Sequence, residues 1–138
     1  MTRLSRLRPL LEVLDVDASI AFYTDVLGFS VIASMDDDAQ PGRKVWASLE
    51  KDDVSLMVNE MHTHDDEDED HGHDHAHEPA LTGSLYFTVD DVDAFALDLG
   101  GKVQIEFGPI DQHYGMRDLG LVDPDGYFLL FGTPIDQA

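Results

Sequence analysis

Most of the histidine in this chain lies in one short stretch, HTHDDEDEDHGHDHAHE, at residues 62–78. Imidazole nitrogens and carboxylate oxygens are ligands for zinc, nickel and copper. The same stretch has almost no apolar residues, so it cannot bury a core and is predicted to be a highly charged linker. We therefore expect adventitious binding of Zn²⁺, Ni²⁺ or Cu²⁺ here, and a metal-binding or metal-sensing role is one hypothesis. The histidines concerned are His62, His64, His71, His73, His75 and His77.

The composition narrows the class of protein and of partner. The chain has 138 residues, 43% of them hydrophobic, which is typical of one globular domain. The absence of cysteine excludes disulfides and zinc–thiolate sites. A net charge of −21 argues against binding to nucleic acid or to an anionic membrane, and it is compatible with a cationic ligand. No signal-peptide pattern or membrane-length apolar run is present, so we expect a cytoplasmic protein.

An internal repeat fixes the expected order of elements. The pattern V-x-D-V-D-A begins at Val13 and again at Val89, which is an offset of 76 residues. Each copy follows an alternating apolar stretch, which predicts a strand, and precedes a helical pattern that ends in glycine. Three further strands are predicted in each half. A repeat of this kind indicates two copies of one structural unit.

The boundaries follow from capping and turn signals. In the first half we predict strands over 8–14, 29–34, 43–50 and 54–60, with a helix capped by Asp17 and ending at Gly28. In the second half we predict strands over 84–89, 103–107, 114–122 and 127–131, with a helix capped by Asp90 or Asp91. The DPDG sequence at 123–126 is a strong turn signal.

These elements predict an α+β fold in a single domain spanning residues 1–138. Two βαβββ modules, at 8–59 and 83–132, are expected on either side of a His/Asp-rich linker at 60–82. Each module should form a curved mixed sheet with a helix on its outer face. The concave faces would then form a cup, which is a favourable place for a small ligand.

The sequence resembles the vicinal oxygen chelate superfamily, which includes glyoxalase I, extradiol dioxygenases and bleomycin-resistance proteins. The matching motifs are VLDVDASIAFYTDVLGFSVI, VWASLEKDDVSLMV, LYFTVDDVDAF and YGMRDLGLVDPDGYFLLF, which together span about residues 8–132. The resemblance implies the glyoxalase/bleomycin-resistance fold. It also implies a homodimer in which each cup is built from both chains.

The resemblance further implies where a metal would bind in the enzymes of this family, which hold one with His and Glu ligands in the cup. Carried over by motif and repeat offset, those positions are Arg8, Leu56, Ser84 and Leu130. Arginine and leucine offer no lone pair to a divalent cation, and serine alone is a weak ligand. We therefore expect no metal and no cofactor in the cup, as in the metal-free bleomycin-resistance branch.

Strand alternation predicts which residues line the cup. The expected lining is Arg8, Glu12, Trp46, Leu56, Ser84, Tyr86, Thr88, Tyr114, Arg117, Phe128 and Leu130. An apolar and aromatic set with a few polar groups is typical of a small-molecule pocket, although the same side chains could simply fill a core. Trp46 could serve packing alone, and Arg117 could pair with an acid such as Glu106 or Asp118.

Three hypotheses follow. The first is non-catalytic binding or sequestration of a small hydrophobic or cationic molecule, as in antibiotic resistance. The second is a metal-dependent lyase, isomerase or dioxygenase of the same superfamily. The third is divalent-metal binding through the linker. No catalytic residue is assigned, because His113, the one histidine outside the linker, has no acid–base partner in the sequence pattern.

Overall fold

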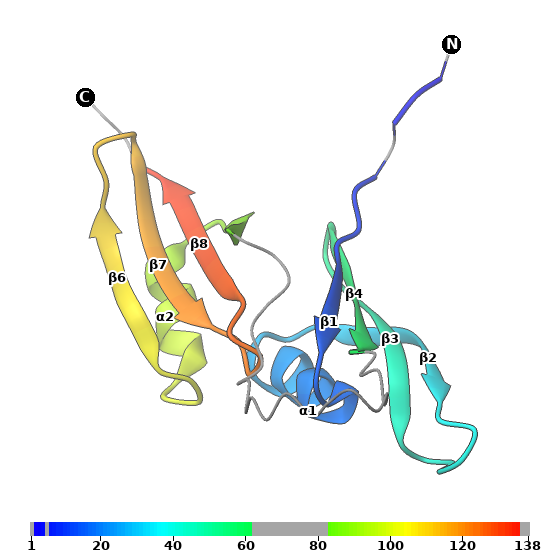
Figure 1. The fold of residues 1–138 in the computed structure, drawn as a ribbon. Helices are drawn as coiled ribbons and strands as arrows, with labels where there is room; N and C mark the ends of the chain where they lie inside the picture. Colours follow the sequence, from blue (N-terminus) through cyan, green and yellow to red (C-terminus); the bar gives the residue numbers. More distant parts are fainter. Residues whose placement is uncertain (1, 5, 62–82, 136–138) are drawn as a thin grey trace, which may run out of the picture.

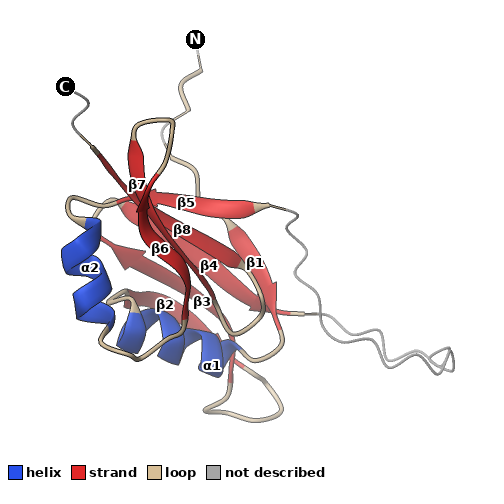
Figure 2. Ribbon diagram, turned by 90° about the vertical axis from the view of Figure 1, so that its left-hand side faces the viewer, coloured by secondary structure: helices blue, strands red, loops and turns tan. Residues whose placement is uncertain are grey.

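A computed structural model describes residues 2–4, 6–61 and 83–135, and it confirms the α+β fold with two modules. Each module is a four-stranded mixed sheet with helical turns on one face (Figures 1 and 2).

The first module contains four strands and two helical segments. Its elements are β1 (Leu10–Val13), α1 (Val16–Ala21), the π-helix η1 (Phe22–Val26), β2 (Ser30–Asp36), β3 (Lys44–Lys51) and β4 (Val54–Glu60). The strand order is β1-β4-β3-β2, and β1 pairs with β4 in parallel. The chain between β1 and β4 therefore crosses from one edge of the sheet to the other before it returns to the strand beside β1.

The second module repeats this topology. Its elements are β5 (Ser84–Thr88), α2 (Val92–Leu99), β6 (Ile105–Asp111), β7 (Met116–Val122) and β8 (Phe128–Pro134). The strand order is β5-β8-β7-β6, again with a parallel pair, between β5 and β8. The two copies of the sequence repeat therefore share the same strand pairing as well as the same order of elements.

The helices begin at capping aspartates. Asp15 caps α1, because its side chain accepts a hydrogen bond from the Ala18 amide at 3.1 Å, so the prediction that Asp17 is the cap is wrong by two residues. Asp91 caps α2 in the same way and binds the Asp93 and Ala94 amides. The helix α2 ends at Gly100, whose φ of 55° is left-handed and suits a residue without a Cβ.

A single apolar cluster runs through both modules between the sheets and the helical segments. On β1 and β8 its members alternate with half-buried or exposed residues, so each sheet buries only one face. The fully buried side chains include Val13, Tyr23, Leu49, Leu119 and Leu129. The opposite face of each sheet is left for contacts outside this cluster.

Two aspartates in the turn between β7 and β8 tie the second module to the first. Asp125 accepts hydrogen bonds from the Leu14 amide at 2.9 Å and from the Ser19 hydroxyl at 3.3 Å. Asp123 accepts one from the Tyr23 hydroxyl at 2.7 Å. Both carboxylates are buried, so their hydrogen bonds to the first module hold the two halves in one relative position. We call Asp123 and Asp125, together with their partners Leu14, Ser19 and Tyr23, the junction.

Candidate functional site

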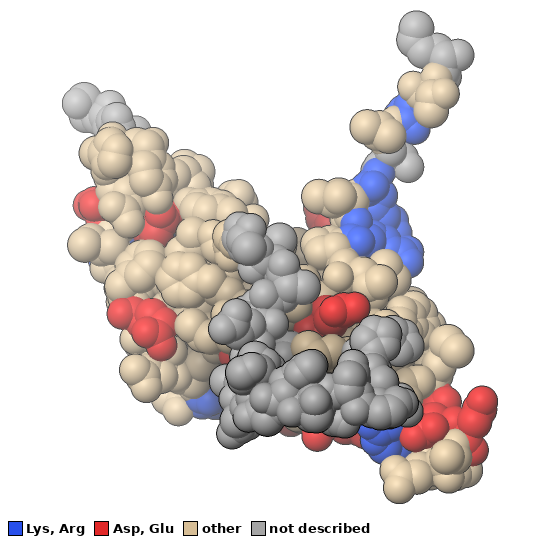
Figure 3. All heavy atoms as spheres, in the orientation of Figure 1, with Lys and Arg blue, Asp and Glu red and all other residues tan. Residues whose placement is uncertain are grey.

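The face of the second sheet that points away from α2 carries most of the predicted cup residues. Ser84, Tyr86 and Thr88 alternate on β5 with Leu85 and Phe87, which pack against the core. The register places Ser84 beside Phe128 and Tyr86 beside Leu130 on β8. The structure therefore brings together the predicted cup residues of β5 and β8. In Figures 1 and 3 this face is turned toward the viewer, and it shows few charged side chains.

A buried carboxylate lies in the middle of this face. Asp118 of β7 is 1% exposed, and it accepts hydrogen bonds from the hydroxyls of Tyr86 and Tyr114, one on each carboxylate oxygen. The two tyrosines are 44% and 54% exposed, so their rings remain open to a ligand. No ion pair joins Asp118 to a Lys or Arg within the described ranges. Among the described residues, the side-chain partners of the Asp118 carboxylate are these two hydroxyl groups.

The hydroxyl groups of both tyrosines hold their protons unusually tightly. The pKa of Tyr86 is raised, first by desolvation and then by its hydrogen bond to Asp118. The pKa of Tyr114 is also raised, with the hydrogen bond to Asp118 as the larger cause. Both tyrosines therefore remain hydrogen-bond donors to Asp118 through neutral and moderately alkaline pH.

A glycine makes room for this arrangement. Gly132 of β8 pairs with Asp118 and with Thr88 in the neighbouring strands. A Cβ at position 132 would lie 2.1 Å from the Tyr86 hydroxyl oxygen and 2.4 Å from a carboxylate oxygen of Asp118. The sequence offered a signal for Asp118, since it alternates with the apolar Leu119 and Leu121. Only the fold shows that Tyr86 and Tyr114 reach it.

The corresponding face of the first sheet carries the remaining cup residues. On β1, Leu10 and Glu12 alternate with the buried Leu11 and Val13. The Arg8 guanidinium, just before β1, lies 3.9 Å from the Met57 sulfur. Further along this face, the register pairs Glu12 with Asn59 and Asn59 with Trp46. Arg8, Glu12 and Trp46 therefore share one side of the sheet.

The Leu56 side chain is buried in the core, so its assignment to the cup face is wrong by one residue, although Leu56 also borders a cleft between the modules. Its side chain is 1% exposed and lies in the core cluster, as does Val58. Met57 takes the expected place, because it pairs with Leu10 just as Leu130 pairs with Tyr86 in the second module. The short turn at 52–53 between β3 and β4 gave the sequence no signal from which to fix this register.

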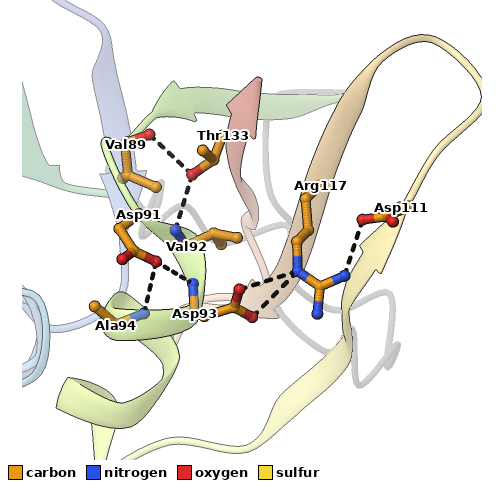
Figure 4. A network of polar contacts seen from close by, with 8 residues as sticks. All are labelled: Val89, Asp91, Val92, Asp93, Ala94, Asp111, Arg117 and Thr133. Carbon is orange, nitrogen blue, oxygen red and sulfur yellow. Dashed lines mark hydrogen bonds and ion pairs between the residues drawn. The ribbon is translucent and has the colours of Figure 1, made fainter. Parts of the chain in front are cut away.

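Arg117 is also not on the cup face. It shares the side of β7 that carries the buried Leu119 and Leu121. Its guanidinium binds Asp111 at 2.8 Å and Asp93, at the start of α2, at 3.1 Å (Figure 4). The expectation that Arg117 pairs with an acid holds, but its partners are not Glu106 or Asp118. Arg117 therefore ties α2 to β6 and β7 instead of facing a ligand.

The residues at the family's metal positions do not fit a divalent cation. With Met57 in place of Leu56, those positions hold Arg8, Met57, Ser84 and Leu130, none of which is a histidine or a carboxylate. Among residues 2–4, 6–61 and 83–135, no group of three or more His, Cys, Asp or Glu could hold a metal ion. The histidines of the linker, from His62 to His77, lie outside the described residues.

A cleft of about 450 Å³ lies between the two modules. It lies where the start of β1 and β4 approaches β5. Its walls include Pro9 and Ser55 from the first module, and Ser84, Tyr86 and Thr88 from the second. This volume lies in the range of drug-sized ligand sites.

The family comparison agrees with this geometry. The model of the Glyoxalase/Bleomycin resistance protein/Dioxygenase superfamily matches residues 7–131. The chain belongs to this superfamily. No protein among the curated sequences matches the chain. Within the described residues, no helix of this superfamily member is long and apolar enough to cross a membrane.

Several solved structures share the fold of this superfamily member at low sequence identity. TnmS3, an antibiotic binding protein from Streptomyces sp. CB03234, is 22% identical, with a TM-score of 0.68, and the match covers 97% of this chain and 99% of that one. TioX from Micromonospora sp. ML1 is 18% identical over 97% and 99%, with a TM-score of 0.66. A glyoxalase/bleomycin resistance protein/dioxygenase from Nocardioides is 20% identical over 100% and 88%, with a TM-score of 0.69.

Proposed function

We propose that this protein binds and sequesters a small hydrophobic or cationic molecule in the cup without transforming it. The observation that carries the proposal is the buried carboxylate of Asp118 between the exposed rings of Tyr86 and Tyr114. A negative charge behind two aromatic faces attracts an organic cation, through the charge itself and through cation–π contacts. The neighbouring apolar side chains would cover the rest of the ligand.

The donor atoms at the family's metal positions support binding over metal-dependent chemistry. Arg8 brings a permanent positive charge to a place where the enzymes hold a cation, and Leu130 brings no donor atom. The likeness in fold to TnmS3, an antibiotic binding protein, supports the same direction. We propose that the sequestered molecule is an antibiotic and that the biological role is antibiotic resistance.

We further propose that two copies associate so that each cup is completed by both chains. Large apolar side chains are exposed on the cup faces of both modules, including Leu10, Met35 and Ile110. A second copy would cover them and deepen the shallow open cleft. Size-exclusion chromatography with light scattering tests this part by mass: a mass of two chains supports it, and a single chain at micromolar concentration contradicts it.

The only tryptophan, Trp46, lies on the cup face and gives a direct test on the full chain. Its fluorescence is followed during titration with tetraphenylphosphonium, a hydrophobic cation, and with triphenylphosphine oxide, a neutral relative. We expect saturable binding of the cation, and binding weakened about tenfold or more by Asp118→Asn, which removes the charge and keeps the shape. Absence of saturable binding, or equal affinity in the variant, would count against the proposal.

A separate assay tests the enzyme alternative. The protein is incubated with the hemithioacetal of glutathione and methylglyoxal in the presence of added Ni²⁺ or Zn²⁺. We expect no turnover above that of the buffer with metal. Turnover that is lost in a Ser84→Ala or Arg8→Ala variant would place chemistry in the cup and overturn the non-catalytic proposal.

A further inference from the structure

The internal repeat places two hairpin turns at equivalent positions. Within the described residues, the turn between β7 and β8 forms side-chain hydrogen bonds with the other module, and the turn between β3 and β4 does not. The turn between β7 and β8 includes residues 123–127, because Val122 and Phe128 are the last paired residues. The turn between β3 and β4 is tighter, since pairing continues to Lys51 and Val54 and leaves only residues 52 and 53. The turn between β3 and β4 therefore brings fewer side chains to its contact with the second module than the turn between β7 and β8 brings to the first.

The helix residues that receive these turns differ in chemistry. By the repeat offset, Ser19 of the first module corresponds to Phe95 of the second, and Tyr23 corresponds to Leu99. Ser19 and Tyr23 donate hydrogen bonds to the carboxylates of the junction. Phe95 and Leu99 have no polar group to donate, so the second module cannot form the equivalent contact with the aspartates of the shorter turn.

An open cleft of about 430 Å³ lies where that contact is missing. Its inner wall is aromatic: Phe131 stacks on Phe87 with ring centres 4.8 Å apart, and the Phe95 ring lies 4.5 Å from Phe131. Leu27 and Phe29 of the first module form the facing wall. This cleft opens on the helix side of the sheets, and it shares the wall residues Asp53, Val54, Phe87 and Thr88 with the cup cleft.

The rim of the cleft has an excess of negative charge. It carries Lys51 and three aspartates, Asp52, Asp53 and Asp90. Lys51 pairs with Asp52 at 3.7 Å. No ion pair joins Asp53 or Asp90 to another residue within the described part of the chain, so two exposed carboxylates remain next to an aromatic wall.

We propose that this cleft, on the helix side of the sheets and away from Asp118, is a second small-molecule site for an amphipathic amine with a flat apolar ring system. The ring packs against Phe95 and Phe131, and the protonated amine lies at the rim near Asp53 and Asp90. A wall of aromatic side chains with a few polar groups at one end is the usual composition of such sites. The negative rim favours an ammonium group over a neutral or anionic one.

The test uses the full chain and a pair of probes that share the naphthyl ring and differ in the head group, a protonated amine in one and a neutral hydroxyl in the other. Binding of 1-naphthylmethylamine and of the neutral 1-naphthylmethanol is followed by backbone amide chemical shifts. We expect the amine to bind about tenfold more tightly and to shift the amides of Phe87, Phe95 and Phe131. The double variant Asp53→Asn/Asp90→Asn, which changes exposed groups only, should bring the amine to the affinity of the alcohol.

Two further variants separate this site from the cup. Phe95→Trp fills the cleft and should abolish the binding that shifts the α2 amides, while Leu97→Ser, at an exposed position of α2 outside the cleft, should leave that binding unchanged. Amine binding that leaves the amides of α2, including that of Phe95, unshifted, or an amine affinity that is unchanged in the double aspartate variant, would overturn the proposal. If Phe95→Trp lowers the melting temperature strongly, the double aspartate variant alone decides, since its side chains are exposed.

Discussion

The Tyr23 hydroxyl of the first module donates a 2.7 Å hydrogen bond to the Asp123 carboxylate of the second, and both side chains are buried. Burial raises the pKa of Tyr23, and the charge of Asp123 raises it further, so the hydroxyl keeps its proton well above neutral pH. The other oxygen of Asp123 accepts the Asp125 and Tyr127 amides. One carboxylate thus organises its own turn and fixes the neighbouring module.

Tyr23→Phe should lower the free energy of unfolding by about 1–3 kcal/mol, because it leaves a buried carboxylate oxygen without its donor. Denaturation in urea measures the change. Ser55→Ala is the control, because it removes a hydroxyl that donates to the partly exposed Glu50 carboxylate. A loss at Tyr23 no larger than the loss at Ser55 would contradict the structural role of the junction.

The junction should also make stability depend on pH in a defined direction. Desolvation raises the pKa of Asp123, so the folded chain keeps this proton to a higher pH than the unfolded chain does. The stability contributed by protonated Asp123 is complete below the unfolded-state pKa, and it is lost as the pH rises through the folded-state pKa. Wild type should therefore gain stability relative to Asp123→Asn as the pH falls from about 7 to about 4.

Parallel urea titrations of the two proteins across this range measure the difference. Asp98→Asn, a substitution at an exposed position of α2, controls for the general loss of one negative charge. A difference between wild type and Asp123→Asn that stays constant with pH would mean that Asp123 does not titrate in the folded state over this range.

Gly132→Ala should disturb the cup through a steric clash. The added methyl group would lie within 2.4 Å of both the Tyr86 hydroxyl oxygen and an Asp118 carboxylate oxygen. We expect a loss of about 1–3 kcal/mol in stability and weaker binding of tetraphenylphosphonium. Adding Tyr86→Phe removes the nearest atom, so the double variant should recover part of the stability. No recovery would show that the clash lies elsewhere on β8.

The register of β4 can be checked with two adjacent truncations. Leu56→Ala should lower the free energy of unfolding by about 2–5 kcal/mol, because the side chain fills the core. Met57→Ala, on the half-exposed cup face, should cost less than about 1.5 kcal/mol and should instead change ligand binding. Thermal and urea denaturation of the pair give the answer, and a reversed order would restore the register expected from the sequence.

The repeated V-x-D-V-D-A pattern was enough to predict both modules, since it marks the same strand-to-helix transition at Val13 and Val89. Alternation also predicted the faces of β1, β5 and β8 correctly, because each of these strands buries one side only. β4 is harder to read, because Leu56, Met57 and Val58 are all apolar. Pairing with β3 and β1 decides which of them face the helix, and local sequence does not contain that information.

The site was less predictable than the fold. Asp118 and Tyr86 are 32 positions apart, so their contact follows from the order of β5, β8 and β7 and not from any motif. Arg117 precedes Asp118 and therefore points to the other face of the same strand, where Asp93 and Asp111 pair with it. The sequence shows that Arg117 and Asp118 point to opposite faces of β7, but it does not show which of the two faces the cup.

The junction also bears on how the chain reaches its native state. The Leu14 amide finds its acceptor in Asp125, 111 positions later, and the backbone oxygen of Glu12 finds its donor in Tyr127, 115 positions later. The first module thus leaves the ribosome before Asp125 and Tyr127, with which it forms these hydrogen bonds, have been synthesised. Since contacts between such distant residues form slowly, we expect the emerging first half to wait in an incomplete form and both halves to become native together.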